Sequence, residues 1–262
     1  MLKISDAQGA IFDVDDTLLD NGSYPDASKG IHAISRIKAI HEVGRLHNNT
    51  ALLSVTSEEN IRGFHTAKVH SLPGAVWNIL YMKGLVDSPD IDPENQLLQE
   101  IVELKNQGHE AVLRAHGKEV RDAGAFVRNL AAHGFADKLA IASASIRRDI
   151  DIFLDMAQLT EYFPANRIVS LEMVKHAKPN KDAFDQAFKL LGLPDSARRS
   201  VYAFEDDPRG VLSAKAAGLY VIAITTRFRS DDAELLAAQP DLIVDSYAEC
   251  NELLGLSAFK DI

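Results

Sequence analysis

Cysteine is almost absent from this chain of 262 residues, and Cys250 is the only one. An intramolecular disulfide and a Cys-rich zinc site are therefore excluded. The longest apolar runs have the length of strands, and Met1–Gln8 is mixed polar. Neither a membrane span nor the apolar core of a signal peptide is predicted, so the expected location is the reducing cytoplasm.

Positive charge is also scarce. The chain has 28 Lys and Arg against 38 Asp and Glu, which gives a formal net charge of −10. This balance argues against a nucleic-acid partner, whose phosphates would have to be neutralised. It does not exclude a small anionic substrate, because a few local cations and backbone amides act at short range. The signatures of P-loop, dinucleotide-binding, zinc-protease and serine-hydrolase sites are absent.

Short apolar runs alternate with helical patterns over most of the chain. Strand-like runs lie at Ala10–Phe12, Leu139–Ala144, Ile168–Ser170, Val201–Phe204, Leu219–Ile224 and Leu242–Val244. Helical spacing of apolar residues marks Arg121–His133, Lys181–Leu191 and Pro208–Ala217. This alternation predicts an α/β fold, a Rossmann-like parallel sheet with helices on both faces.

One long segment, from about residue 21 to 116, interrupts the alternation. It has almost no strand-like run, and helical patterns lie at Ile31–Val43, Glu58–Val69, Ala75–Met82 and Glu94–Lys105. It is far too long for a loop between a strand and a helix. We therefore predict an all-helical domain at 21–116, inserted after the first strand of a core domain formed by 1–20 and 117–262.

Few side chains of this insertion stand out. Trp77 and Tyr81 are one helical turn apart and are expected to lie in the insertion's own core rather than to stack on a ligand. Arg62 and His65 are also one turn apart and could meet a substrate, but solvated surface is the favoured interpretation for both and for His70.

Asp13-Val14-Asp15-Asp16-Thr17 directly follows the apolar run Gly9–Phe12. The run is typical of the end of a buried strand. In a strand, Asp13 and Asp15 would project to the same side, and two such carboxylates repel each other without a cation or a shared proton. The motif therefore points to metal-assisted chemistry. The structural alternative is that Asp15 or Asp16 caps a following helix.

Polar groups also follow two later strands. Ala142-Ser143-Ala144-Ser145 offers a hydroxyl and a closely approachable backbone, although Ser145 could instead cap a helix near Ile146. Lys178 precedes a predicted helix N-terminus, where the potential favours anions, although most surface lysines are merely solvated.

The acidic run Glu205-Asp206-Asp207-Pro208 follows Val201–Phe204. Asp207 has a structural explanation as the N-cap of a helix that begins at Pro208. Glu205 and Asp206 remain at the strand end, where like charges are unfavourable without a counterion. Carboxylate oxygens in this arrangement suit Mg²⁺.

The chain thus has four motifs in order at strand ends: Asp-x-Asp-x-Thr, a serine hydroxyl, a lysine and an acidic pair. In this pattern it resembles the haloacid dehalogenase-like (HAD) hydrolase superfamily, in the helical-cap branch that contains phosphatases and β-phosphoglucomutase-like proteins. The resemblance covers Ala10–Thr17 and Arg121–Leu254. It implies that Asp13 attacks phosphorus to form an aspartyl phosphate, and that Asp15 protonates the leaving oxygen and then activates water.

The resemblance also implies the remaining roles. Mg²⁺ would be bound by Asp13, the backbone carbonyl of Asp15 and Asp206, with Glu205 as the nearby alternative. Ser143, Lys178 and the amide beside Ser143, that of Ala144, would hold the phosphoryl group, while Thr17 helps to fix the loop. The helical insertion corresponds in position to the family's cap.

The predicted function is that of a Mg²⁺-dependent phosphatase acting on a small phosphorylated metabolite. The main alternative is a sugar phosphomutase of the β-phosphoglucomutase kind, for which no second cationic phosphate site is identified. Dehalogenation is disfavoured because Asp15 and the metal acids have no role in it. A non-catalytic binding protein would be expected to lack Asp13, Asp15 or Lys178. The oligomeric state is left open between a monomer and a weak dimer.

Overall fold

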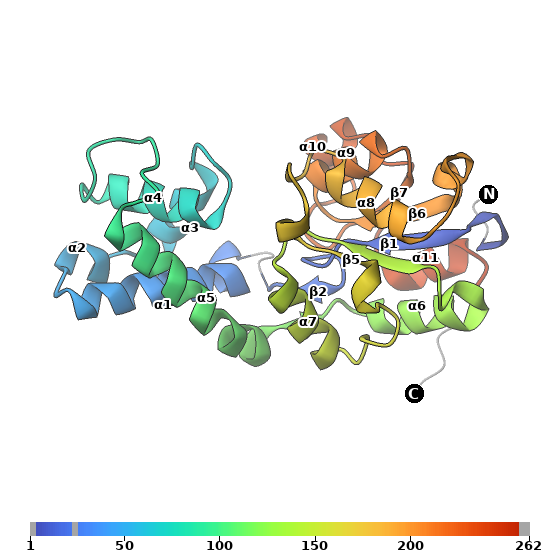
Figure 1. The fold of residues 1–262 in the computed structure, drawn as a ribbon, viewed down its shortest axis with the longest axis horizontal. Coiled ribbons are helices and arrows are strands. Elements are labelled where there is room, and N and C mark those ends of the chain that lie inside the picture. The colour runs from blue at the N-terminus through green and yellow to red at the C-terminus, as the bar shows by residue number, and fades with distance from the viewer. Residues whose placement is uncertain (1–3, 23–25, 257–262) are drawn as a thin grey trace. The chain divides into compact units, whose positions relative to one another are not determined.

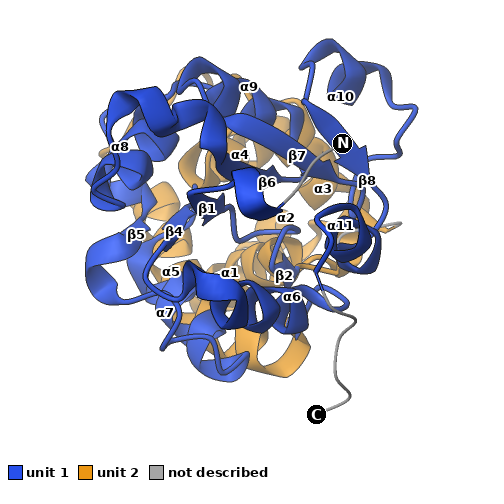
Figure 2. Ribbon diagram, turned by 90° about the vertical axis from the view of Figure 1, so that its right-hand side faces the viewer, with its two compact units in different colours: residues 1–20, 118–262 blue, residues 21–117 orange. Residues whose placement is uncertain are grey.

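The computed structural model describes residues 4–22 and 26–256, which fall into two compact units (Figure 2). Residues 1–20 and 118–262 form one unit, called here the sheet unit, and residues 21–117 form the other, called the helical unit. The domain ranges predicted from the sequence also include residues 1–3, 23–25 and 257–262, which lie outside the described residues.

The sheet unit is built on a six-stranded sheet in the order β5-β4-β1-β6-β7-β8, and every neighbouring pair is parallel (Figure 1). The strands are β1 Gly9–Phe12, β4 Leu139–Ala142, β5 Ile168–Val169, β6 Val201–Glu205, β7 Tyr220–Ile224 and β8 Leu242–Val244. The helices are α6 Ala123–Leu130, α7 Arg147–Met156, α8 Asp182–Leu190, α9 Pro208–Ala216, α10 Ala233–Ala237 and α11 Tyr247–Leu253. The predicted parallel α/β architecture is confirmed.

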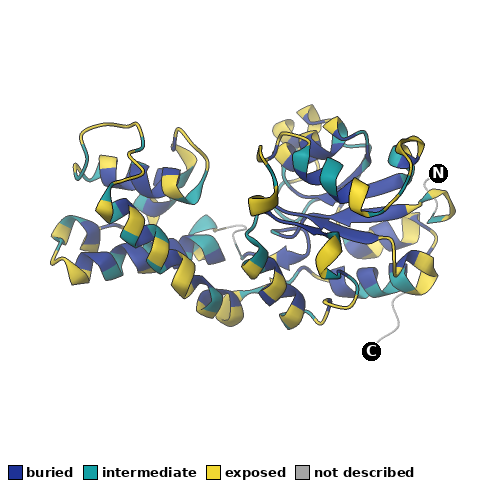
Figure 3. Ribbon diagram, viewed as in Figure 1, coloured by how far each residue is buried: buried dark blue, intermediate teal, exposed yellow. Residues whose placement is uncertain are grey.

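Helices cover both faces of this sheet (Figure 1). Alternate strand residues point to opposite faces, so Ile11 joins a core with Phe184 of α8 and Val211 of α9. On the other face, Phe12 stacks on Phe204 with ring centroids 4.5 Å apart. Figure 3 shows the strands as the most deeply buried part of the unit. Apart from Glu205 at the end of β6, the strands consist of apolar and aromatic residues and glycine, because helices cover both faces of the sheet.

A small antiparallel pair marks the two ends of the insertion. Strand β2 (Leu19–Asp20) pairs with β3 (Lys118–Glu119), so the chain leaves and re-enters the sheet unit at neighbouring points. This pair was not predicted from the sequence, since two residues are too few to show an alternating pattern.

The regular elements of the helical unit, within the part of 21–117 that the structure describes, are all helices. The α-helices are α1 Ile31–Leu46, α2 Thr50–Leu53, α3 Ser57–His65, α4 Leu72–Met82 and α5 Gln96–His116. Thr56 and Glu59 form a reciprocal capping box at the start of α3. Among the described residues, no helix combines the length and the apolar character needed to cross a membrane.

The helical unit has its own core, which includes Trp77 together with Ile40 and Ile101. The prediction for Trp77 is thus confirmed, but the prediction for Tyr81 is wrong, because that residue is 43% exposed. Tyr81 lies in the last turn of α4 and lines a shallow surface depression instead of the core. Arg62, His65 and His70 are exposed, as expected.

Candidate active site

The polar strand ends meet at the carboxyl edge of the sheet, around its central strand β1. From β1 the chain continues to β4 and β5 on one side of β1. It then crosses to β6, which lies on the other side of β1. The edge of a parallel sheet at such a reversal of strand order is where ligands bind in this class of fold. Residues 13–17 follow β1 and residues 143–145 follow β4 at this edge, while Glu205 is the last residue of β6 and Asp206 follows it.

Asp13 is the first residue after β1. Its backbone N–H donates to the carbonyl of Phe204 at 3.0 Å, which continues the pairing with β6. The residue is only 5% exposed, and its Oδ1 accepts a hydrogen bond from Lys178 Nζ at 2.6 Å. Burial raises the pKa of Asp13 well above its usual range; Lys178 opposes this, and the charges of Glu205 and Asp15 add to it.

Lys178 joins two buried carboxylates. Its Nζ lies 2.6 Å from Asp13 Oδ1 and 2.5 Å from Glu205 Oε1, and over the ring of Phe184 at 4.7 Å. Burial alone would lower the pKa of Lys178, but the charges of Asp13 and Glu205 outweigh it and raise the pKa. Lys178 is therefore a fixed, protonated cation beside Asp13, not a solvated surface lysine.

Both carboxylate oxygens of Glu205 are occupied. Oε1 accepts from Lys178, and Oε2 accepts the backbone N–H groups of Asp206 and Asp207 at 3.1 and 3.2 Å. Burial raises the pKa of Glu205, and Lys178 opposes that rise. Asp207 caps α9 through its side chain, and Pro208 begins that helix, as predicted.

Asp206 has one free oxygen. Its Oδ1 accepts from Thr17 Oγ1 at 3.1 Å, whereas the buried Oδ2 has no hydrogen-bond partner among the described residues. Burial raises the pKa of Asp206 well above its usual range, and the nearby carboxylates Glu205, Asp13 and Asp16 raise it further. An unpaired carboxylate oxygen in a buried acidic group is costly unless a cation meets it.

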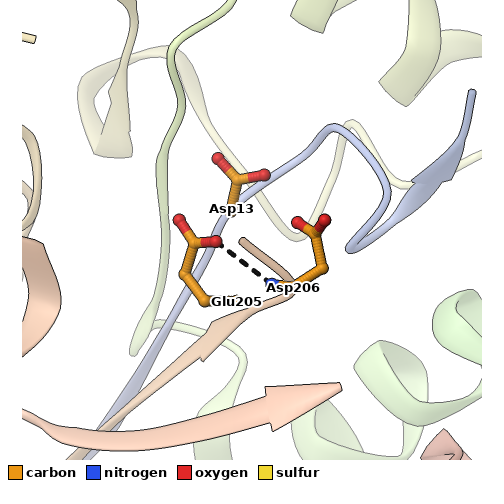
Figure 4. Close-up of side chains that lie close together, drawn as sticks. All are labelled: Asp13, Glu205 and Asp206. Carbon is orange, nitrogen blue, oxygen red and sulfur yellow. Dashed lines mark hydrogen bonds between the residues drawn. The ribbon is translucent and has the colours of Figure 1, made fainter. Parts of the chain in front are cut away.

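The residues present fit a divalent cation. Ligand oxygens of Asp13, Glu205 and Asp206 all lie within 4.8 Å of one another, and the three side chains gather beside the strand ends (Figure 4). All three donors are hard carboxylate oxygens, the type that Mg²⁺ prefers. Because Glu205 is committed to Lys178 and two backbone amides, we expect Asp13 and Asp206 to supply the side-chain ligands.

The carboxylate of Asp15 does not belong to this acidic group in the described residues. Its Oδ2 instead accepts a hydrogen bond from Ser145 Oγ. The capping alternatives from the sequence are wrong: the chain enters β2 soon after Asp15 and Asp16, and α7 has Ile146 as its N-cap. The predicted role of the Asp15 carbonyl as a metal ligand stays a prediction.

The phosphate-binding candidates lie at the end of β4. Ser143 is buried and its Oγ accepts the backbone N–H of Ser145 at 3.0 Å, while Ala144 between them is exposed. This turn leaves backbone at the surface next to the serines, as expected of a segment that a ligand approaches closely.

Three residues of the site were missed from the sequence. Thr226, just after β7, donates its hydroxyl to the carbonyl of Asp16, and Tyr247 of α11 donates to the carbonyl of Thr17 at 3.1 Å. Gly210 of α9 lies against the carboxylate of Glu205. Thr226 could have been proposed as a site residue because it closely follows a predicted strand. Neither Tyr247 nor Gly210 lies in a motif that would have identified it.

Replacing Asp206 with Asn is expected to stabilise the metal-free protein. The raised pKa of Asp206 means that ionising this carboxyl is costlier in the fold than in the unfolded chain, so stability is lost as the pH rises from the unfolded-state pKa toward the folded-state one. Asn removes that charge. We expect a gain of about 1–2 kcal/mol at pH 8, or roughly 2–8 °C in melting temperature. The gain should shrink toward pH 4.

Thermal melts in EDTA between pH 4 and pH 8 measure this difference. The control is Asp231→Asn, since the side chain of Asp231 is 71% exposed and its replacement should change the melting temperature little. A lower melting temperature for Asp206→Asn than for the wild type at pH 8 would show that the carboxylate is not strained by its neighbours.

Curated relatives match only part of the chain. Glycerol-1-phosphate phosphohydrolase 1 of Saccharomyces cerevisiae is 30% identical over 101 residues, which are 36% of this chain and 38% of the relative. Validoxylamine A 7'-phosphate phosphatase of Streptomyces hygroscopicus subsp. limoneus is 32% identical over 78 residues, 30% of this chain and 34% of the relative. The chain thus spans little more than a third of the length of these relatives.

Among solved structures, a family IA, variant 3 HAD hydrolase from Entamoeba histolytica superposes with a TM-score of 0.69, covering 94% of this chain and 97% of the other at 21% identity. At 21% identity this similarity supports the fold alone. The model of the haloacid dehalogenase-like hydrolases matches residues 7–218, which contain Asp13–Thr17, Ser143, Lys178 and Glu205–Asp206. The chain therefore belongs to the haloacid dehalogenase-like hydrolase family.

Proposed function

We propose that this protein is a Mg²⁺-dependent phosphatase that hydrolyses small phosphorylated metabolites through an aspartyl-phosphate intermediate. The observation that carries the proposal is the arrangement of three buried groups. Lys178 fixes the carboxylate of Asp13 at 2.6 Å, and Asp206, in the same acidic group, keeps one oxygen without a partner.

In the first step, a carboxylate oxygen of Asp13 forms a bond to phosphorus while the bond from phosphorus to the ester oxygen breaks. Asp15 gives its proton to that leaving oxygen. In the second step, Asp15 takes a proton from water, whose oxygen attacks phosphorus and releases Asp13. Asp13 and Asp206 would hold a Mg²⁺ ion. When bound, this ion would neutralise part of the phosphate charge and so let the phosphate approach the carboxylate of Asp13.

The remaining residues would hold the transferring group. Lys178 supplies a positive charge beside Asp13, which would stabilise the negative charge of a phosphate bound there. The hydroxyl of Ser143 and the amide of Ala144 would supply hydrogen bonds to the phosphate oxygens. Ser145 orients Asp15 through their hydrogen bond. These groups lie at the ends of β1, β4 and β6 and, for Lys178, in the segment before α8, and their mutual hydrogen bonds hold them in place before substrate arrives.

The relatives lend support to the substrate class. The Saccharomyces relative is named as a phosphohydrolase of glycerol 1-phosphate and the Streptomyces relative as the phosphatase of validoxylamine A 7'-phosphate. Both names describe small phosphorylated molecules. A small, doubly anionic ester also fits an acidic protein whose proposed site has the buried cation Lys178 beside Asp13. The cytoplasmic location stays a prediction.

The test is phosphate release from a panel of sugar phosphates, glycerol phosphates, phosphoglycolate and nucleotides, with Mg²⁺ or with EDTA. We expect release from at least one small ester with Mg²⁺, and at least about 100-fold less in EDTA, because metal-assisted charge stabilisation supplies several kcal/mol. Equal rates in EDTA would refute the metal dependence. Interconversion of two sugar phosphate isomers without phosphate release would favour the mutase alternative.

A further inference from the structure

Tyr247 is the only tyrosine among the described residues that donates its hydroxyl to the turn carrying Asp13. It is the first residue of α11 and is fully buried. Its ring packs against Phe126 and Phe204, with centroids 5.0 and 6.3 Å away. Its hydroxyl donates to the carbonyl of Thr17 at 3.1 Å.

The ring and the hydroxyl of Tyr247 serve different purposes. A phenylalanine would fill the same apolar space between the rings of Phe126 and Phe204. The buried hydroxyl adds a desolvation cost that only a hydrogen bond offsets, so its contact with Thr17 is the feature that distinguishes tyrosine here. The hydroxyl therefore acts on the turn rather than on the core.

Thr17 connects that turn to the acidic group. It is completely buried, its carbonyl accepts from Tyr247, and its own hydroxyl donates to Asp206 Oδ1 at 3.1 Å. With Oδ1 held in this way, Asp206 keeps Oδ2 as the oxygen without a partner. The two hydrogen bonds form a continuous path from α11 through Thr17 to Asp206.

We propose that Tyr247 is a positioning residue for divalent-cation binding, which it sets through Thr17. The hydroxyl of Tyr247 fixes the backbone of Thr17, and the hydroxyl of Thr17 then fixes the side-chain rotamer of Asp206. The cation meets an oxygen that is already oriented, so less ordering free energy is lost on binding. This inference rests on the proposed cation site, but the proposed function does not require Tyr247.

The test measures Mg²⁺ binding directly, by calorimetric titration of the metal-free protein. Tyr247→Phe should weaken Mg²⁺ binding by about 3- to 10-fold, and Thr17→Val, which removes the direct bond to Asp206, by about 10- to 100-fold. Because Tyr247 acts through Thr17, the double variant should bind Mg²⁺ no more weakly than Thr17→Val alone.

The matched control is Tyr220→Phe. Tyr220 lies in β7 with its ring beside Arg199, and the substitution removes its hydroxyl. Its Mg²⁺ affinity should equal that of the wild type. With Mg²⁺ at saturation, Tyr247→Phe should leave KM for the phosphate ester unchanged, because the hydroxyl does not touch the substrate. Thermal melts establish that each variant is folded.

The outcomes separate the two proposals. If the wild type binds no Mg²⁺, the proposed metal dependence fails and this inference falls with it. If the wild type binds Mg²⁺ and Tyr247→Phe binds it equally well, only the positioning role is overturned. Multiplicative losses in the double variant would also overturn the path through Thr17, since they would show that Tyr247 acts independently of it.

Discussion

Replacing Asp13 with Asn is expected to abolish phosphate-ester hydrolysis, lowering kcat by on the order of 10⁴-fold or more. The amide has nearly the shape of the carboxylate but is not a nucleophile. The substitution also removes one of the two carboxylates that Lys178 contacts and one proposed side-chain ligand of the cation. Glu205 remains to pair with Lys178, so the fold should persist.

The measurement combines steady-state kinetics with acid quenching of reactions that contain ³²P-labelled substrate. The wild type should yield protein-bound phosphate that hydroxylamine removes, as expected of an acyl phosphate. Asp13→Asn should yield none. Asp15→Asn should slow both the formation and the hydrolysis of the labelled protein, because it removes the acid of the first step and the base of the second.

The control for these kinetics is Asp16→Asn. Asp16 lies in the same turn but outside the group that could hold a cation, and its positive φ of 56° is a conformation that Asn adopts readily. This variant should keep activity within about tenfold of the wild type, because it removes a charge that raises the pKa of Asp206 but neither the nucleophile nor a member of the acidic group. Retention of more than about 1% of the wild-type kcat by Asp13→Asn would contradict a role as nucleophile.

The sheet could be predicted because its strands are buried on both faces and read as uninterrupted apolar runs. Strands β1, β6 and β8 agree with their predicted ranges to within one residue. The helix predicted at Arg121–His133 is shorter in the structure, since α6 ends at Leu130 and a distorted turn follows. Helix α11 was missed, because its seven residues are too few to show an apolar stripe of helical spacing.

The convergence of Asp13, Ser143 and Glu205–Asp206 at one edge could be expected, since parallel strands present their carboxyl ends together. Which of these side chains contact one another could not be predicted from the sequence. That Lys178 bridges Asp13 and Glu205, and that Ser145 reaches Asp15 rather than capping α7, depends on distances between segments far apart in the chain. No local pattern encodes such distances.

Gly210 illustrates a requirement that only packing reveals. A glycine within a helix costs about 1 kcal/mol relative to alanine, so its presence in α9 calls for a reason. A Cβ at Gly210 would lie 1.8 Å from Glu205 Oε1 and 2.0 Å from its Cδ. Glu205 cannot simply swing away, because Lys178 and two backbone amides hold its carboxylate. The missing side chain makes room for the acid that anchors Lys178.

Replacing Gly210 with Ala is therefore expected to destabilise the protein by about 3 kcal/mol, in the upper range for overpacking a rigid core. This corresponds to a fall in melting temperature of roughly 6–12 °C. Phosphatase activity should fall by about 10- to 100-fold, because displacement of Glu205 loosens Lys178 beside Asp13. Thermal melts and kinetics at saturating Mg²⁺ measure the two effects.

Gly108 of α5 provides a matched substitution with the opposite expected sign. It also lies within a helix, but it is exposed and a Cβ there would meet no atom within 4 Å. Gly108→Ala should raise stability by about 0.5–1 kcal/mol through the helix propensity of alanine and leave activity unchanged. If both variants were stabilised alike, Glu205 would have another position to occupy. Lys178 would then be held by Asp13 alone, and the bridge between the two carboxylates would not be needed for the site.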